Sequence, residues 1–221
     1  AVYHGPDGIR AIANHVHGLA TKTAAGLAAK GIALGTDSYF DTLWIKGVDC
    51  QSVRAKAEAQ KLNFRYISDS ELSISFGEPH TDADVAAILS CFDASSVGNG
   101  ASALSAGLKR TDDVLTHPVF NSHHSESKMM RYLKRLENKD LSLVHSMIPL
   151  GSCTMKLNAA TELMPITNPQ FANLHPFAPV EQAAGYHEMF RQLSLDLSES
   201  TGFAGVSLQP NSGAQGEYAG L

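Results

Sequence analysis

The order of hydrophobic patterns in residues 1–93 limits the fold more than any other feature of the sequence. Apolar residues recur there at helical or strand spacing in six consecutive segments. The helices are predicted over residues 5–30 and 52–62 and after Thr81, and the strands over residues 39–46, 63–67 and 71–76. Short connections between these segments favour one α/β unit with a mostly antiparallel sheet and helices on one face. Phe40 and Trp44 share a face of the first strand and are predicted to lie in the core.

The pattern is interrupted over residues 94–116, which are rich in Gly, Ser and Ala, a composition typical of a linker. Beyond it, helical periodicity returns after Ser122 and after Pro179, with a long irregular stretch between them. The sequence therefore predicts a small α/β domain over residues 1–93, a linker over 94–116 and the truncated start of a second domain over 117–221. Because the chain lacks an initiator Met, we expect it to be a segment of a longer polypeptide.

Charge and cysteine spacing exclude several classes of protein. The net charge is −5, and no cluster of Lys and Arg indicates a nucleic-acid or anionic-membrane partner. No apolar run approaches the roughly 20 residues of a membrane span. Cys50, Cys91 and Cys153 are too far apart for a CxxC pair, which favours a reducing compartment. His123 and His124 lack the spacing of a helical metal pair, and no metal site is predicted.

The end of the sequence predicts an anion site. A short strand at residues 206–208 is expected to run through a polar, glycine-bearing turn into a helix. Backbone N–H groups of Gly213, Ala214 and Gln215 would face outward at the helix start, with the hydroxyl of Ser212 beside them. The turn has neither a GK[ST] motif nor a full GxGxxG motif, so a single phosphate ester fits better than a polyphosphate. The alternative is an ordinary strand-to-helix turn.

A second polar stretch lies within residues 144–158. Its small side chains at Ser152, Cys153 and Thr154 stand next to Lys156 and could line a carboxylate or phosphate pocket. Cys153 as a nucleophile would need a nearby base, and the nearest histidine precedes it by eight residues. The alternative is a polar loop whose hydroxyls bond to its own backbone.

Several long strings resemble one enzyme family, the P-protein of the glycine cleavage system, a pyridoxal-phosphate (PLP)-dependent glycine decarboxylase. The most specific are MIPLGSCTMKLN at 147–158, FANLHPFAPVEQAAGY at 171–186 and LQPNSGAQGEYAGL at 208–221. Further strings of the same family occupy residues 1–20 and 116–146, so the resemblance covers nearly the whole chain.

The resemblance implies a type I PLP-dependent, aspartate-aminotransferase-like α/β fold in each of two tandem halves of a longer chain. This sequence would begin in the small domain of the first half and end in the large domain of the second half. It implies that Ser212, Gly213, Ala214 and Gln215 hold the PLP phosphate, and that the loop with Ser152, Cys153, Thr154 and Lys156 borders the active-site entrance. The family's Schiff-base lysine is expected downstream of Leu221, so no catalytic residue is assigned in this chain.

The resemblance also implies an activity and partners. Glycine would lose CO2, and its aminomethyl group would pass to the lipoyl arm of the H-protein, within a homodimer that works with the other components of the system. The strings AAGYHEMF and HVHGLA resemble plant and algal members, which favours the mitochondrial matrix over a bacterial cytoplasm. Two alternatives stay open: a non-catalytic interaction module of that enzyme, or another type I PLP enzyme such as an aminotransferase.

Overall fold

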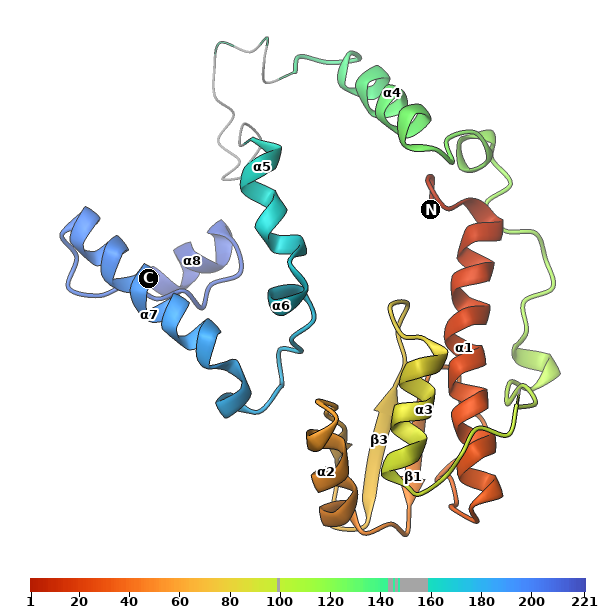
Figure 1. Ribbon diagram of the computed structural model, residues 1–221. Coiled ribbons are helices and arrows are strands. Elements are labelled where there is room, and N and C mark those ends of the chain that lie inside the picture. The colour runs from red at the N-terminus through yellow and green to blue at the C-terminus, as the bar shows by residue number, and fades with distance from the viewer. Residues whose placement is uncertain (99, 143–144, 146, 148–158) are drawn as a thin grey trace. The chain divides into compact units, whose positions relative to one another are not determined.

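The computed structural model describes residues 1–98, 100–142, 145, 147 and 159–221. The chain divides into two compact units, Ala1–Glu137 and Asn138–Leu221 (Figure 1). The domain boundaries that the sequence predicts, at residues 94 and 116, stay predictions.

Unit 1 contains the predicted α/β arrangement. Its helices and strands, in chain order, are α1 (Gly5–Ala29), β1 (Thr42–Lys46), α2 (Cys50–Ala59), β2 (Arg65–Tyr66), β3 (Glu71–Ser75), α3 (Asp82–Cys91) and α4 (Glu126–Glu137). Two short 3-10 helices, η1 (Ala106–Leu108) and η2 (Pro118–Asn121), precede α4. The three strands form one antiparallel sheet in the order β1-β3-β2, which confirms the predicted antiparallel pairing (Figure 1).

One face of this sheet builds the core with the helices. Leu43 and Ile45 of β1 pair with Ile74 and Leu72 of β3, and all four are buried. Buried side chains of the helices complete the cluster, among them Leu19 and Leu27 of α1, Val53 of α2, and Val85 and Leu89 of α3. The helical and strand periods thus bring their apolar faces together, as the sequence predicts.

The predicted burial of Phe40 and Trp44 is wrong. Phe40 precedes β1 and is 41% exposed. Trp44 is half-buried on the opposite sheet face from Leu43, with its indole N–H bonded to Glu71 at 3.1 Å and Lys46 over its ring at 3.8 Å. Side chains alternate along a strand, so once Leu43 takes the core face Trp44 must take the other.

The Gly/Ser-rich segment after α3 lies against α1. His17 donates from Nδ1 to the Phe40 carbonyl at 2.8 Å, and its Nε2 is 3.0 Å from the Ser102 hydroxyl. A Cβ on Gly100 would lie only 2.2 Å from the Thr21 carbonyl oxygen. Glycine is therefore required at this contact for steric reasons.

Unit 2 is built of helices in the residues that the structure describes. They are α5 (Ala160–Leu163), η3 (Met164–Thr167), α6 (Pro169–Ala172), η4 (Val180–Ala183), α7 (Ala184–Thr201) and α8 (Gly213–Gly220). The predicted helix after Pro179 is confirmed, with a 3-10 first turn, and it ends at the left-handed Gly202. The predicted strand at residues 206–208 is wrong: strands need a pairing partner, and no strand occurs in the described part of unit 2. Among the described residues, no helix is long and apolar enough to cross a membrane.

Candidate functional site

The start of α8 gathers the four residues that the sequence predicts for an anion site. Ser212 is the N-cap in an extended conformation, and the first intrahelical bond runs from the Gly216 N–H to the Ser212 carbonyl at 3.0 Å. The N–H groups of Gly213, Ala214 and Gln215 therefore have no acceptor within the helix. They stand at the positive end of the helix dipole, where a negative charge is stabilised.

Two side chains at this helix start have different tasks. The Ser212 hydroxyl makes no capping bond in the described structure, so it is available to an incoming anion. The Gln215 amide oxygen instead accepts the N–H of Asn211 at 2.5 Å. Gln215 thus closes the turn with its side chain and offers only its backbone N–H to a ligand. Sequence reasoning assigned Gln215 to the site but did not foresee this bond.

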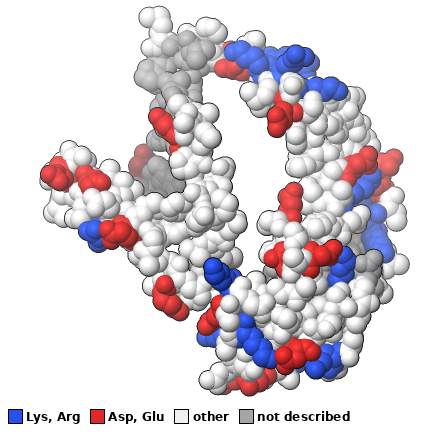
Figure 2. Space-filling view, in the orientation of Figure 1, with Lys and Arg blue, Asp and Glu red and all other residues white. Residues whose placement is uncertain are grey.

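Backbone groups supply the electrostatics of this helix start. In the sequence of unit 2 the cationic side chains are Lys139, Lys156 and Arg191, and Arg191 is paired with Glu188. Positive charge instead gathers over α4 of unit 1, where Figure 2 shows a group of Lys and Arg side chains. The described helix start thus offers an anion its backbone N–H groups and the Ser212 hydroxyl.

The second predicted stretch lies outside the described residues. This holds for Ser152, Cys153, Thr154 and Lys156, whose role at an active-site entrance stays a prediction. Nearby in the sequence, the Ser142 hydroxyl lies 2.9 Å from Nδ1 of His145.

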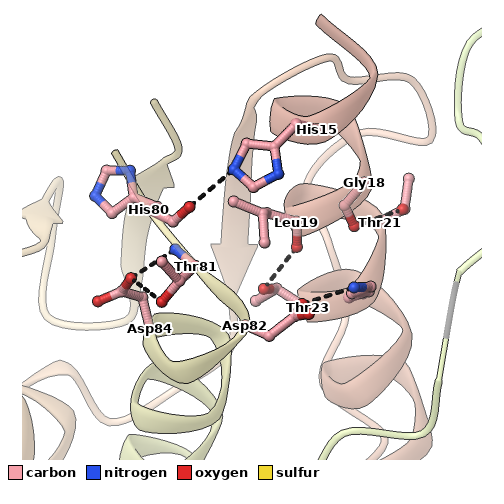
Figure 3. A network of polar contacts seen from close by, with 10 residues as sticks. His15, Gly18, Leu19, Thr21, Thr23, His80, Thr81, Asp82 and Asp84 are labelled. Atoms are coloured by element: carbon pink, nitrogen blue, oxygen red, sulfur yellow. Dashed lines mark hydrogen bonds and ion pairs between the residues drawn. The ribbon is translucent and has the colours of Figure 1, made fainter. Parts of the chain in front are cut away.

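A shallow groove along α1 was missed by sequence reasoning. It has a volume of about 380 Å³ and is lined by Asn14, His15, Gly18, Leu19, Thr21, Lys22, Asp82 and Gly100. Its polar groups are engaged. Lys22 pairs with Asp82 at 2.6 Å. His15 donates from Nε2 to the His80 carbonyl at 2.8 Å, as Figure 3 shows. These bonds join α1 to the start of α3. Because the partners are 60 and 65 residues apart, no local pattern could have revealed them.

The remaining candidate groups serve the packing of unit 1. The thiols of Cys50 and Cys91 are free and buried, and burial raises the pKa of both. His123 stacks on Tyr132 with ring centroids 4.3 Å apart. Over the described ranges of the chain, no group of three or more His, Cys, Asp or Glu side chains could hold a metal ion.

Comparison with known proteins gives a consistent result for both units. Residues 1–92 match the family model of the glycine cleavage system P-protein. The whole chain aligns at 52% identity with 24% of the glycine dehydrogenase (decarboxylating) of Shewanella pealeana, and likewise at 52% identity with 24% of that of Vibrio vulnificus. The chain thus spans about a quarter of the length of these curated relatives. Both relatives are bacterial and give no support to a mitochondrial location.

Proposed function

We propose that this chain is a segment of a glycine cleavage system P-protein and that it works within a PLP-dependent glycine decarboxylase. The observation that carries the proposal is the 52% identity to a glycine dehydrogenase (decarboxylating), which extends over the whole chain. In the proposed reaction glycine loses CO2 and its aminomethyl group passes to the lipoyl arm of the H-protein.

The start of α8 fits the phosphate of PLP. A phosphate ester needs several converging donors, and this helix start offers three backbone N–H groups and the Ser212 hydroxyl. An extended N-cap leaves the first turn open, and no acidic residue lies in that turn. These features support the assignment of Ser212, Gly213, Ala214 and Gln215 as phosphate ligands.

In the proposed mechanism the residues of this chain bind and orient. When bound, PLP supplies the electron-withdrawing ring that the loss of CO2 from glycine requires. The Ser212 hydroxyl and the α8 N–H groups would anchor its phosphate, and Gln215 would keep the turn closed by holding the Asn211 N–H. The loop with Ser152, Cys153, Thr154 and Lys156 is proposed to border the entrance. No lysine of this chain is proposed to bind the cofactor covalently.

The same proposal extends to architecture, partners and compartment. We infer a type I PLP fold for the whole protein, a homodimer, and exchange with a lipoylated H-protein and the other components of the system. The bacterial relatives favour a bacterial cytoplasm over the mitochondrial matrix.

Activity is tested on the full-length protein that contains this chain. Exchange of labelled bicarbonate into the glycine carboxyl group, dependent on the H-protein, is the expected result. Transamination of glycine without this exchange would instead indicate another type I PLP enzyme.

The phosphate site is tested by two substitutions that remove one donor each. Ser212→Ala deletes the hydroxyl, and Gly213→Pro deletes one N–H at the first helical position, where proline is tolerated. Hydrogen bonds to charged groups contribute about 1.5–3 kcal/mol, so each change should weaken PLP binding at least about tenfold.

The control for these substitutions is Ser200→Ala, an exposed hydroxyl near the end of α7 that bonds to the Asp196 carbonyl. Its PLP affinity should stay at the wild-type value, measured by titration of the apoprotein and followed by PLP absorbance. Wild-type affinity in both site variants would reject α8 as the phosphate site.

A further inference from the structure

One hydrogen-bond pattern occurs at three proline turns of the described chain: His117-Pro118-Val119, Asn168-Pro169-Gln170 and His175-Pro176-Phe177. In each turn the side chain before the proline accepts the N–H of the residue after it. The acceptors are Nδ1 of His117 at 3.1 Å, Oδ1 of Asn168 at 3.1 Å and Nδ1 of His175 at 3.0 Å.

The backbone of the three turns is also alike. The carbonyl of the first residue accepts the N–H three residues later, from Phe120 at 3.0 Å, Phe171 at 2.9 Å and Ala178 at 2.9 Å. His117 and Asn168 have nearly the same dihedral angles, φ −62°, ψ 138° and φ −64°, ψ 121°. Each turn thus uses the same cap, with imidazole in two cases and an amide in the third.

The two kinds of cap respond differently to protons. The Asn168 amide oxygen is an acceptor at every pH near neutrality. An imidazole nitrogen accepts only while it carries no proton, and free imidazole titrates between about pH 5 and 8. A proton on Nδ1 would place two donors against each other, because the backbone N–H cannot turn away without opening the turn. The bond is therefore intact at high pH and lost as the pH falls.

We propose that His117 and His175 are proton-sensitive caps that hold their turns closed when neutral and release them when protonated. Asn168 is the proton-insensitive form of the same cap. The fold therefore contains two local pH switches, one in each unit.

Each switch acts on a defined neighbour. The His117 turn begins η2, and the Phe120 carbonyl of that turn is so close to α1 that a Cβ on Gly5 would lie 2.8 Å from it. Release of the cap loosens η2 at the start of α1. The His175 turn joins α6 to η4, and its release frees Phe177, whose side chain is already 91% exposed.

Charged and titratable side chains occur close to each turn in the sequence. For His117 they are Arg110, Asp112, Asp113, His123 and His124, together with His4, Asp7 and Arg10 of α1, the helix that contacts η2. For His175 they are Glu181 of η4, and Tyr186, His187, Glu188 and Arg191 of α7. Several neutralise one another in the pairs Asp7–Arg10, Arg110–Asp112 and Glu188–Arg191.

Hydrogen exchange in the full-length protein containing this chain tests the proposal. Peptides that begin at His117, Asn168 or His175 and end three residues later report on two amides each, since proline has none. Between pH 8 and pH 5.5, and after correction for intrinsic rates, the protection of the Val119 and Phe177 amides should fall about fivefold, the factor expected for one hydrogen bond of about 1 kcal/mol. The Gln170 amide should show no such change.

Exchanging the two caps supplies matched variants. His117→Asn and His175→Asn should keep the protection at pH 8 and remove its pH dependence, and Asn168→His should introduce one at Gln170. Pro118 and Pro176 stay in place, so the turns remain constrained. Equal pH dependence of Val119, Phe177 and Gln170 in the wild type, or pH dependence retained in both Asn variants, would overturn the proposal.

Discussion

At the scale of single residues, a side chain decides whether a backbone donor at a helix start is free or engaged. At α8 the Gln215 side chain takes the Asn211 N–H and leaves the first turn of the helix open. At α3 the N-cap hydroxyl is engaged as well, because the Asp84 carboxylate accepts both the Thr81 N–H at 2.6 Å and the Thr81 hydroxyl at 2.9 Å. The backbone N–H and the hydroxyl of the α3 N-cap are thereby engaged.

The cap of α3 should make stability depend on pH. The hydrogen bonds from the Thr81 backbone and hydroxyl lower the pKa of Asp84 below its usual value. A lowered pKa in the folded state means that the stabilisation is present above the ordinary pKa of aspartate, about 3.9, and is lost as the pH falls through the folded value. Asp84→Ala should therefore lower the free energy of unfolding by about 1 kcal/mol at pH 7 and by much less near pH 3.

Urea denaturation at the two pH values measures this difference. Asp37→Ala, which removes an exposed carboxylate from the loop before β1, serves as the control and should change stability little at either pH. An equal loss for Asp84→Ala at pH 7 and pH 3 would contradict the role of the carboxylate charge.

At the scale of elements, α1 holds two interior glycines in opposite environments. A Cβ on Gly18 would meet no atom within 4 Å. A Cβ on Gly26 would lie 2.7 Å from both Leu89 methyl groups of α3 and 2.9 Å from the Ser95 carbonyl oxygen. Gly26 therefore sets how closely α1 approaches α3 and the segment after it, whereas Gly18 has no such task.

Alanine at these two positions should change stability in opposite directions. Glycine costs about 1 kcal/mol relative to alanine inside a helix, so Gly18→Ala should raise the free energy of unfolding by up to about that amount. Gly26→Ala gains the same propensity but overpacks the contact with Leu89, and should lower the free energy of unfolding by about 1–3 kcal/mol.

Thermal unfolding of both variants under one condition measures the two changes in stability. Because both variants make the same Gly→Ala change inside α1, each one controls for the effect of helix propensity in the other. Stabilisation by Gly26→Ala would mean that the Leu89 side chain moves aside freely. Destabilisation by Gly18→Ala would show that the groove beside it is filled.

The same elements explain how far the sequence predicts the fold. The Thr81 cap could be predicted because Asp84 follows Thr81 by three residues. The antiparallel sheet could be predicted because strands show a local alternation of apolar and polar residues. The burial of Trp44 was mispredicted because side chains alternate between the two faces of the sheet along β1. This alternation does not show which face the helices cover. The strand predicted at residues 206–208 is wrong, because a short apolar run does not show whether another strand is there to pair with it. The groove between α1 and α3 depends on contacts such as that of Lys22 with Asp82, which no local pattern encodes.

At the scale of the whole molecule, the two units differ in how much apolar surface they bury. Every buried hydrophobic residue of the described chain lies between Val16 and Phe92, in unit 1. Unit 2 leaves large side chains exposed along α7, including Met189, Phe190 and Leu193. Since hydrophobic burial is the main favourable term in folding, unit 1 has a source of independent stability that the described residues of unit 2 do not provide.

Separate expression of the units tests this difference. Residues 1–137 should unfold in one cooperative transition on heating. Residues 138–221 should show helical circular dichroism without a cooperative transition. Calorimetry of each piece measures both outcomes, and a sharp transition in residues 138–221 alone would show that this unit has a core of its own.

The candidate site was predictable in part. Ser212 to Gln215 could be placed at a helix start because glycine and small polar residues at such a turn have a local physical meaning. The hydrogen bond from the Asn211 N–H to the Gln215 side chain could not be predicted, since it depends on the side-chain rotamer of Gln215.

The core of unit 1 comes from one continuous stretch of sequence, and this has a consequence for biosynthesis. At about 5–20 residues per second, a ribosome needs roughly 4–17 seconds to add residues 138–221. Small domains commonly fold within about a second. Unit 1 can therefore bury its apolar side chains while the helices of unit 2 are still being translated.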